Sequence, residues 1–141
     1  PGIVASAAIR DSLLEDPAMQ EISRRWRELT MTIMGIGNIE PSDVLASSGN
    51  AFAADERAEL LADGAVGDIC HRTYRLDGSP VQEGFDERVI AIPVDDLRRI
   101  PRRLGIAGGA HKVDAIRGAL AGGWVNALVT DLRTAQSLLE T

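Results

Sequence analysis

The chain has 141 residues, a formal net charge of -6 and a hydrophobic content of 45%, which together indicate one globular domain with a substantial core. The acidic balance argues against a nucleic-acid-binding face, which is normally basic, and the arginine clusters at residues 24–27 and 98–103 are interleaved with acids and apolar residues, as in solvated faces or subunit contacts. The single cysteine excludes an internal disulfide, and no apolar run approaches the roughly 18 residues of a membrane span, so we expect a cytoplasmic location without membrane contact.

The first quarter of the chain predicts two helices and then a buried strand. Residues 3–14 favour a short helix, and Asp16 followed by Pro17 is typical of the start of a second helix, which ends near Glu28. Apolar residues at i, i+3 and i+7 predict a buried stripe on this second helix, formed by Met19, Ile22 and Trp26. At residues 29–37, "LTMTIMGIG", the apolar residues no longer follow helical spacing and form a run that is closed by two glycines. This pattern indicates a buried strand entering a loop.

The middle of the chain predicts mainly one helix and one extended segment. Residues 40–50 favour a short helical piece and a turn, and residues 53–64 favour a helix with Gly64 at its C-cap. Residues 65–76 are expected to be extended and to end in an Asp77–Gly78 turn. This segment predicts a hairpin-like insertion in the fold.

The second half of the chain alternates strands with helices. Strands are expected at residues 87–94, at 102–109, where the strand runs into a glycine pair, and at 126–131; helices are expected at 95–100, 111–123 and 132–140. Such alternation is typical of right-handed crossovers and predicts an α/β fold with a largely parallel sheet.

The loop after Ala107 is a candidate anion site. Ligands of α/β sheets bind at the carboxyl ends of strands, and three loops are expected there, after Met34, Ala107 and Thr130. Gly108 and Gly109 allow close backbone approach, and the following helix start offers free N–H groups and partial positive charge. Lys112, the only lysine, is unfavourable there by roughly 0.3–1 kcal/mol unless an anion binds. The alternative is that Lys112 points to water, since no complete phosphate-loop fingerprint is present.

Other polar residues are weaker candidates. Gly35 and Gly37 form a second glycine loop at a strand end, and Asp68 is either a surface or turn acid, or a carboxylate that binds sugar hydroxyls or acts as a general base. Asp131 is explained as the N-cap of the last helix.

The two histidines and the cysteine do not predict a metal site. His71 and His111 lie far apart, without acidic or cysteine partners at metal-ligand spacing. His111 is within reach of a ligand at the glycine pair, whereas we expect His71 to be structural or exposed. Cys70 is expected to be a small buried apolar group.

Taken in order, the motifs "MGIGN", "GAVGD", the Asp77–Gly78 turn, "AGGAHK", "ALAGG" and "LVTDLRTA" resemble the C-terminal effector domain of SorC-family sugar-responsive transcriptional regulators. The resemblance covers essentially the whole chain. It implies a fold similar to ribose-5-phosphate isomerase and glucosamine-6-phosphate deaminase, and a sugar or phosphosugar effector that alters DNA binding by the full regulator. It also implies a homo-oligomer, either a dimer or a tetramer, and no cofactor.

The resemblance assigns roles to residues at the expected loops. Gly35 and Gly37 would form a pocket loop, Asp68 would accept hydroxyl hydrogen bonds, and Lys112 would donate to a phosphate or sugar oxygen. The anion site would be lined by Gly108, Gly109 and Ala110, with His111 beside it. Ala110 and His111 occupy positions where small hydroxylated residues often occur in the family, so the effector's identity stays open.

The same resemblance predicts that residues 1–141 are the C-terminal part of the effector domain. The chain starts without an initiator methionine or a basic signal-peptide region. We expect the helix-turn-helix domain, through which alone DNA would be bound, and a first α/β portion with another phosphate-binding loop to lie outside it.

Three functions follow from these residues. The favoured one is effector sensing, with no catalytic residue. The second is a sugar-phosphate isomerase or deaminase with Asp68 as general base, which needs a second acid or base such as His111. The third is a purely structural oligomerisation fragment.

Overall fold

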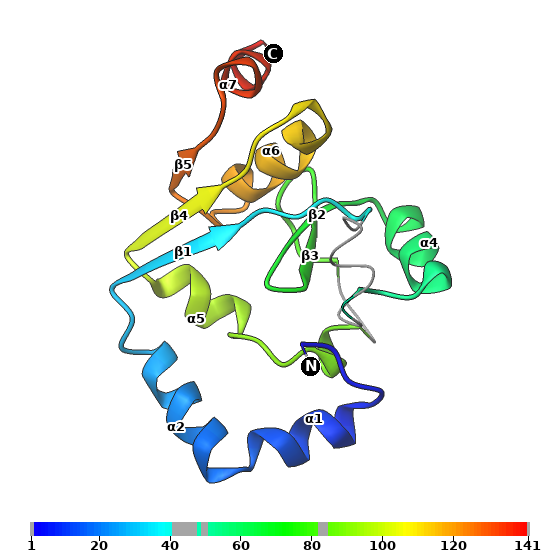
Figure 1. The fold of residues 1–141 in the computed structure, drawn as a ribbon, viewed down its shortest axis with the longest axis vertical. Coiled ribbons are helices and arrows are strands. Elements are labelled where there is room, and N and C mark those ends of the chain that lie inside the picture. Colours follow the sequence, from blue (N-terminus) through cyan, green and yellow to red (C-terminus); the bar gives the residue numbers. More distant parts are fainter. Residues whose placement is uncertain (1, 41–47, 49–50, 82–84, 141) are drawn as a thin grey trace.

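The structure is a computed structural model that describes residues 2–40, 48, 51–81 and 85–140. The helical piece predicted at residues 40–50 lies almost entirely outside the described residues. Three parallel strands form the main sheet (Figure 1): β1 (Met31–Gly35), β4 (Arg102–Ile106) and β5 (Ala127–Val129), in the order β1-β4-β5. In this sheet Ile33 pairs with Leu104, which pairs with Ala127. The α/β class and the parallel sheet are therefore confirmed.

The described helices follow the predicted order closely. They are α1 (Ala7–Leu14), α2 (Pro17–Trp26), α4 (Ala54–Ala62), α5 (Val94–Arg99), α6 (Val113–Ala121) and α7 (Leu132–Leu139), with short 3-10 turns η1 (Asp86–Arg88) and η2 (Ala110–Lys112). Asp16 caps α2 as predicted, because its carboxylate accepts the N–H of Ala18 at 2.8 Å. The buried stripe predicted on α2 is wrong, because no residue of this helix is buried: Ile22 is 45% exposed, and Trp26, at the end of the helix, packs against the core as a partly buried side chain.

The strand predicted at residues 87–94 is wrong. The segment consists of η1 and an irregular run in which Val89 forms one isolated bridge to Ile3 of the N-terminal segment. Its apolar pattern reflects the burial of Val89 and Ile92 in the core rather than pairing in the sheet. Pro93 then begins α5.

A tight antiparallel hairpin replaces the single extended segment predicted at residues 65–76. Strands β2 (Ala65–Ile69) and β3 (Arg72–Arg75) are joined at Cys70 and His71. Both joining residues have positive φ, 53° and 62°, as hairpin turns of the primed types require. Because few residues other than glycine adopt positive φ, the sequence gives no turn signal there. The predicted Asp77–Gly78 turn also exists and follows β3: the N–H of Gly78 donates to Arg75 O at 2.8 Å.

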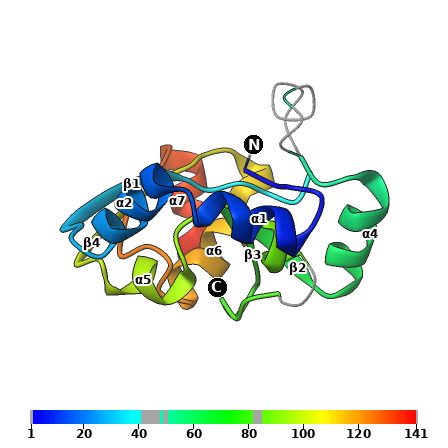
Figure 2. The ribbon, with the colours of Figure 1, turned by 90° about the horizontal axis from the view of Figure 1, so that it is seen from below.

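The main core lies between the hairpin, α5, α6 and one face of the sheet (Figure 2). Its largest fully buried side chains include Tyr74 and Trp124, whose polar atoms are satisfied: the Tyr74 hydroxyl donates to Ala115 O at 3.0 Å and the Trp124 indole donates to Gly78 O at 2.9 Å. A Cβ at Gly78 would lie 2.1 Å from the backbone of Gly122. The backbones of the Asp-Gly turn and of the "ALAGG" motif thus touch, which explains why both contain glycine at the contact.

The two arginine clusters have different roles. Arg24 and Arg25 both pair with Glu21 at 2.9 Å on the surface of α2, which is the solvated face predicted. In the second cluster, Arg103 donates to the carbonyl oxygen of Gly123 at 3.1 Å, so it stabilises the connection between α6 and β5.

Candidate functional site

The loop after β1 contacts the start of the hairpin at Gly37 and Asp68. Their backbones form an isolated antiparallel bridge, with Gly37 N donating to Asp68 O at 2.9 Å and Asp68 N donating to Gly37 O at 3.1 Å. A Cβ at Gly37 would lie 1.8 Å from Asp68 Oδ1. Glycine is therefore required at position 37 for this carboxylate to keep its place.

Lys112 extends from η2 to the same loop. Its Nζ donates to Ile36 O at 2.9 Å, and the side chain is half-buried. Burial lowers the pKa of Lys112, while the charge of Asp68 opposes this shift. An ammonium group has three donors, so the single contact with Ile36 leaves two for a ligand. Lys112 therefore does not simply point to water, which was the alternative expectation.

Asp68 is a half-buried carboxylate beside this lysine. Burial raises its pKa, opposed by the charge and the backbone N–H of His71 and, more weakly, by the charge of Lys112. The His71 N–H donates to Asp68 Oδ2 at 3.2 Å. Asp68 and Lys112 thus influence each other electrostatically, yet they are not among the ion pairs of the described side chains. The fold brings together three predicted site residues, Gly37, Asp68 and Lys112.

The glycine pair contacts the last helix instead of presenting all its amides to solvent. Gly109 has a φ of 100°, and its N–H donates to both Asp131 Oδ2 and Thr134 Oγ1 at 2.8 Å. A Cβ at Gly108 would lie 2.5 Å from Asp131 Oδ2. Hydrogen bonds from Thr134 and Gly109 lower the pKa of Asp131 to about 2. Asp131 therefore does more than cap α7: it fixes the conformation of the glycine loop, a role that the sequence does not reveal.

The next two amides are available at this loop. Within the described part of the chain, the N–H groups of Ala110 and His111 have no hydrogen-bond partner. The helix begins as the 3-10 turn η2, so regular α-helix starts at Val113 rather than at His111. The His111 ring is exposed and adjoins Gly109, where an added Cβ would lie 2.9 Å from His111 Cε1. Gly35 is also exposed, at the end of β1.

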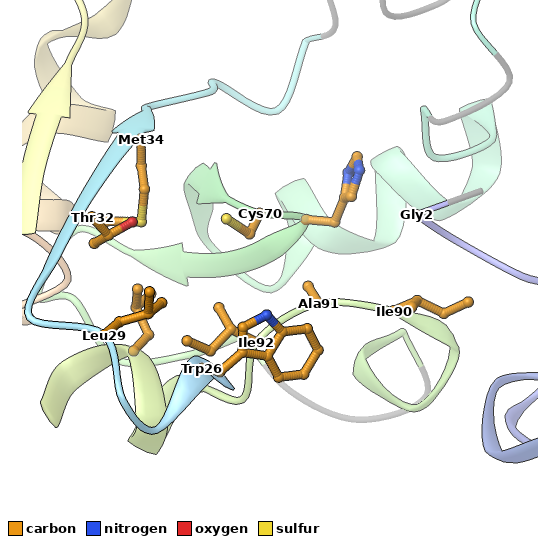
Figure 3. A pocket seen from close by; sticks show the side chains of 11 residues that line it. Gly2, Trp26, Leu29, Thr32, Met34, Cys70, Ile90, Ala91 and Ile92 are labelled. Atoms are coloured by element: carbon orange, nitrogen blue, oxygen red, sulfur yellow. The ribbon is translucent and has the colours of Figure 1, made fainter. Parts of the chain in front are cut away.

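An apolar pocket of about 380 Å³ lies beside the hairpin turn at Cys70 and His71 (Figure 3). It is lined by Gly2, Trp26, Leu29, Thr32, Met34, Cys70, His71, Ile90, Ala91, Ile92 and Leu97. The prediction that Cys70 is buried is wrong, because the hairpin turn places it at the surface. The pocket adjoins the polar site through His71, whose backbone binds Asp68. Sequence periodicity gives no indication of this pocket.

The described residues contain no group of three histidine, cysteine or acidic side chains arranged to hold a metal ion. None of their helices has the length and apolar character needed to cross a bilayer.

Comparison with known proteins relates this geometry to a family. Residues 1–140 match the Sugar-bind family of sugar-binding domains. The sorbitol operon regulator of Klebsiella pneumoniae is 33% identical over an alignment 141 positions long, which covers 99% of this chain and 44% of the relative. The crystal structure of full-length SorC from Klebsiella pneumoniae has a TM-score of 0.91 and 32% identity, covering 99% of this chain and 45% of that one.

A sugar-binding domain of a transcriptional repressor from Vibrio fischeri has a TM-score of 0.87 and 30% identity, covering 99% of this chain and 56% of that one. The chain thus spans less than half the length of the curated relative, but nearly all of the chain takes part in each match. It belongs to the sugar-binding domain family of SorC-type transcriptional regulators.

Proposed function

We propose that this chain binds a sugar or sugar phosphate and thereby senses an effector for a bacterial transcriptional regulator. The observation that carries the proposal is the half-buried pair Asp68 and Lys112, held beside Gly37 without an ion pair between them. A carboxylate accepts hydrogen bonds from sugar hydroxyls, and an ammonium group with two unused donors binds phosphate or sugar oxygens. The family and the sorbitol operon relative support the same ligand class.

The loop at η2 favours a ligand with an anionic group. The unpartnered N–H groups of Ala110 and His111 directly precede Lys112, and the N-terminal end of a helical segment attracts negative charge. The amide of Gly109 is engaged by Asp131, so the anion would be held by the two later amides and the lysine.

Catalysis is the less favoured function, because the relatives are named as regulators and both Tyr74 and Asp131 are engaged in hydrogen bonds, which leaves the exposed ring of His111 as the second acid–base candidate. Tyr74 donates its hydroxyl to Ala115 O, and burial raises the pKa of this phenol. Asp131 is held ionised by Thr134 and Gly109. Isomerisation of a phosphosugar above the uncatalysed rate would overturn the sensor assignment. We further propose that the chain acts within a homo-oligomer and that DNA is contacted by other parts of the regulator.

Substitution of the lysine tests the proposal. Lys112→Ala should weaken binding of a sugar phosphate by about 1.5–3 kcal/mol, as expected for a hydrogen bond to a charged group, or about 10- to 150-fold in Kd. Isothermal titration of the regulator against a panel of sugar phosphates measures this change. Arg133→Ala is the matched control, since it removes an exposed cation from α7. An unchanged affinity in Lys112→Ala would refute the role of Lys112.

A further inference from the structure

Two side chains at the start of α7 hold the glycine loop from outside it. Asp131 Oδ2 and Thr134 Oγ1 both accept the N–H of Gly109, each at 2.8 Å. The Thr134 hydroxyl also donates to Asp131 Oδ2 at 2.6 Å, and the Thr134 N–H donates to Asp131 Oδ1 at 2.9 Å. We call this closed set of hydrogen bonds between Asp131, Thr134 and Gly109 the α7 clamp.

The α7 clamp restrains residues that cannot restrain themselves. Gly109 has a φ of 100°, a conformation that glycine adopts freely but shares with many others. A Cβ at Gly108 would lie 2.5 Å from Asp131 Oδ2, so this residue has no side chain with which to pack either. Thr134, in contrast, is only 1% exposed and is fixed by its surroundings. The rigidity of the loop therefore comes from α7.

Gly109 connects the α7 clamp to the candidate anion site. Its carbonyl oxygen accepts the N–H of Lys112 at 2.9 Å, which closes the turn η2. Within the described part of the chain, the two unpartnered amides of this turn belong to Ala110 and His111. The direction of both amides thus depends on the conformation of Gly109, whose own N–H is held by α7.

We propose that Asp131 and Thr134 are positioning residues for effector binding, which act through Gly109 rather than by touching the effector. The inference rests on the proposed anion site at η2. A turn that is already ordered loses little conformational entropy when an anion binds, whereas a free glycine loop has to be ordered at that step. A carboxylate near an anion is unfavourable by itself, but the donors of Gly109 and Thr134 offset the charge of Asp131.

Conservative substitutions test this role in the full-length regulator. Thr134→Val keeps the buried volume but removes the hydroxyl that accepts from Gly109, whereas Thr134→Ser keeps the hydroxyl and loses a methyl group. Asp131→Asn retains a side chain that can cap a helix, but its single acceptor oxygen cannot serve both Thr134 N and Gly109 N. Isothermal titration with hexose, pentose and hexitol phosphates gives the Kd of each variant for the compound that the unchanged regulator binds most tightly. Circular dichroism verifies that each variant is folded.

We expect Thr134→Val and Asp131→Asn each to raise this Kd about 3- to 10-fold, as for one lost hydrogen bond, and Thr134→Ser to stay within about twofold of the unchanged regulator. Equal weakening in Thr134→Ser and Thr134→Val would overturn the proposal, because the effect would then follow packing and not the hydroxyl. An unchanged Kd in Thr134→Val would also overturn it, as would tighter binding in Asp131→Asn, since the carboxylate would then compete with the anion. If the unchanged regulator binds none of the sugar phosphates, the proposed function itself fails and this inference fails with it.

Discussion

The contact between Gly37 and Asp68 gives a prediction that needs no ligand. A Cβ at Gly37 would lie 1.8 Å from Asp68 Oδ1, and its three nearest neighbours are all atoms of the Asp68 carboxyl group. Such contacts are essentially never shorter than 3.0 Å, so in Gly37→Ala the carboxylate must retreat by about 1.2 Å. The hydrogen bond from His71 N to Asp68 Oδ2, at 3.2 Å, would be distorted. Overpacking of this kind costs about 1–3 kcal/mol of unfolding free energy.

A double-mutant cycle isolates this clash. In an Asp68→Ala background the clashing atoms are gone, so adding Gly37→Ala should change the unfolding free energy by less than about 0.5 kcal/mol. The interaction energy of the cycle should then be about 1–3 kcal/mol in magnitude. Urea unfolding of the four proteins measures it, provided that the m-values stay equal. Additive effects, with Gly37→Ala equally destabilising in both backgrounds, would refute the reasoning.

Three further predictions concern a charge, a helix cap and a core hydrogen bond. Because burial lowers the pKa of Lys112 from 10.5 and an anion binds its charged form, titrations from about pH 7 to about pH 10 should show falling phosphosugar affinity. Lys112→Arg should abolish this fall. If the pH profile of Lys112→Arg were identical to that of the unchanged chain, Lys112 would not be the group that binds the anion. Asp131 has its pKa lowered from 3.8 to about 2, so its contribution to stability is present above pH 3.8 and is lost as the pH falls to about 2. As the pH falls over this range, the melting temperature of Asp131→Asn should therefore approach that of the unchanged chain. A constant difference between the two melting temperatures would contradict this role of Asp131. Trp124→Phe removes the 2.9 Å bond to Gly78 O and should cost about 1–3 kcal/mol in urea unfolding; a loss below about 0.5 kcal/mol would show that this bond contributes little.

The parts of the fold that sequence predicts well are those with local signals. Asp16 and Asp131 are cap residues followed by helices, and both caps form as predicted. The three strands end at glycine or polar loops because their apolar runs stop there. The segment at residues 87–94 shows the limit of this reasoning, because burial of Val89 and Ile92 against other elements produces the same apolar pattern as a strand.

The contacts of the candidate site depend on the tertiary fold and have no local signal. Lys112 binds a carbonyl that is 76 positions away in the chain, and Asp131 binds the amide of Gly109 across 22 positions. The resemblance to a family selects Gly37, Asp68 and Lys112 as candidates, and the structure brings these three together. Only the structure, however, identifies Asp131 and Thr134 as the residues that hold the glycine loop.

The choice of lysine at position 112 also has a physical reason. Every other fixed positive charge in the chain is an arginine, and arginine stays charged and presents a planar fork of donors. Lys112 instead carries a compact ammonium group. One of its three N–H donors is occupied by Ile36 O. Its location is unfavourable in two ways, since burial lowers its pKa and it directly precedes α6, where the helix dipole disfavours a cation. The charge of Asp68 offsets these costs in part, but the two side chains do not form an ion pair. A bound anion would relieve both, so we expect effector binding to raise the pKa of Lys112 and to stabilise η2 together with the start of α6.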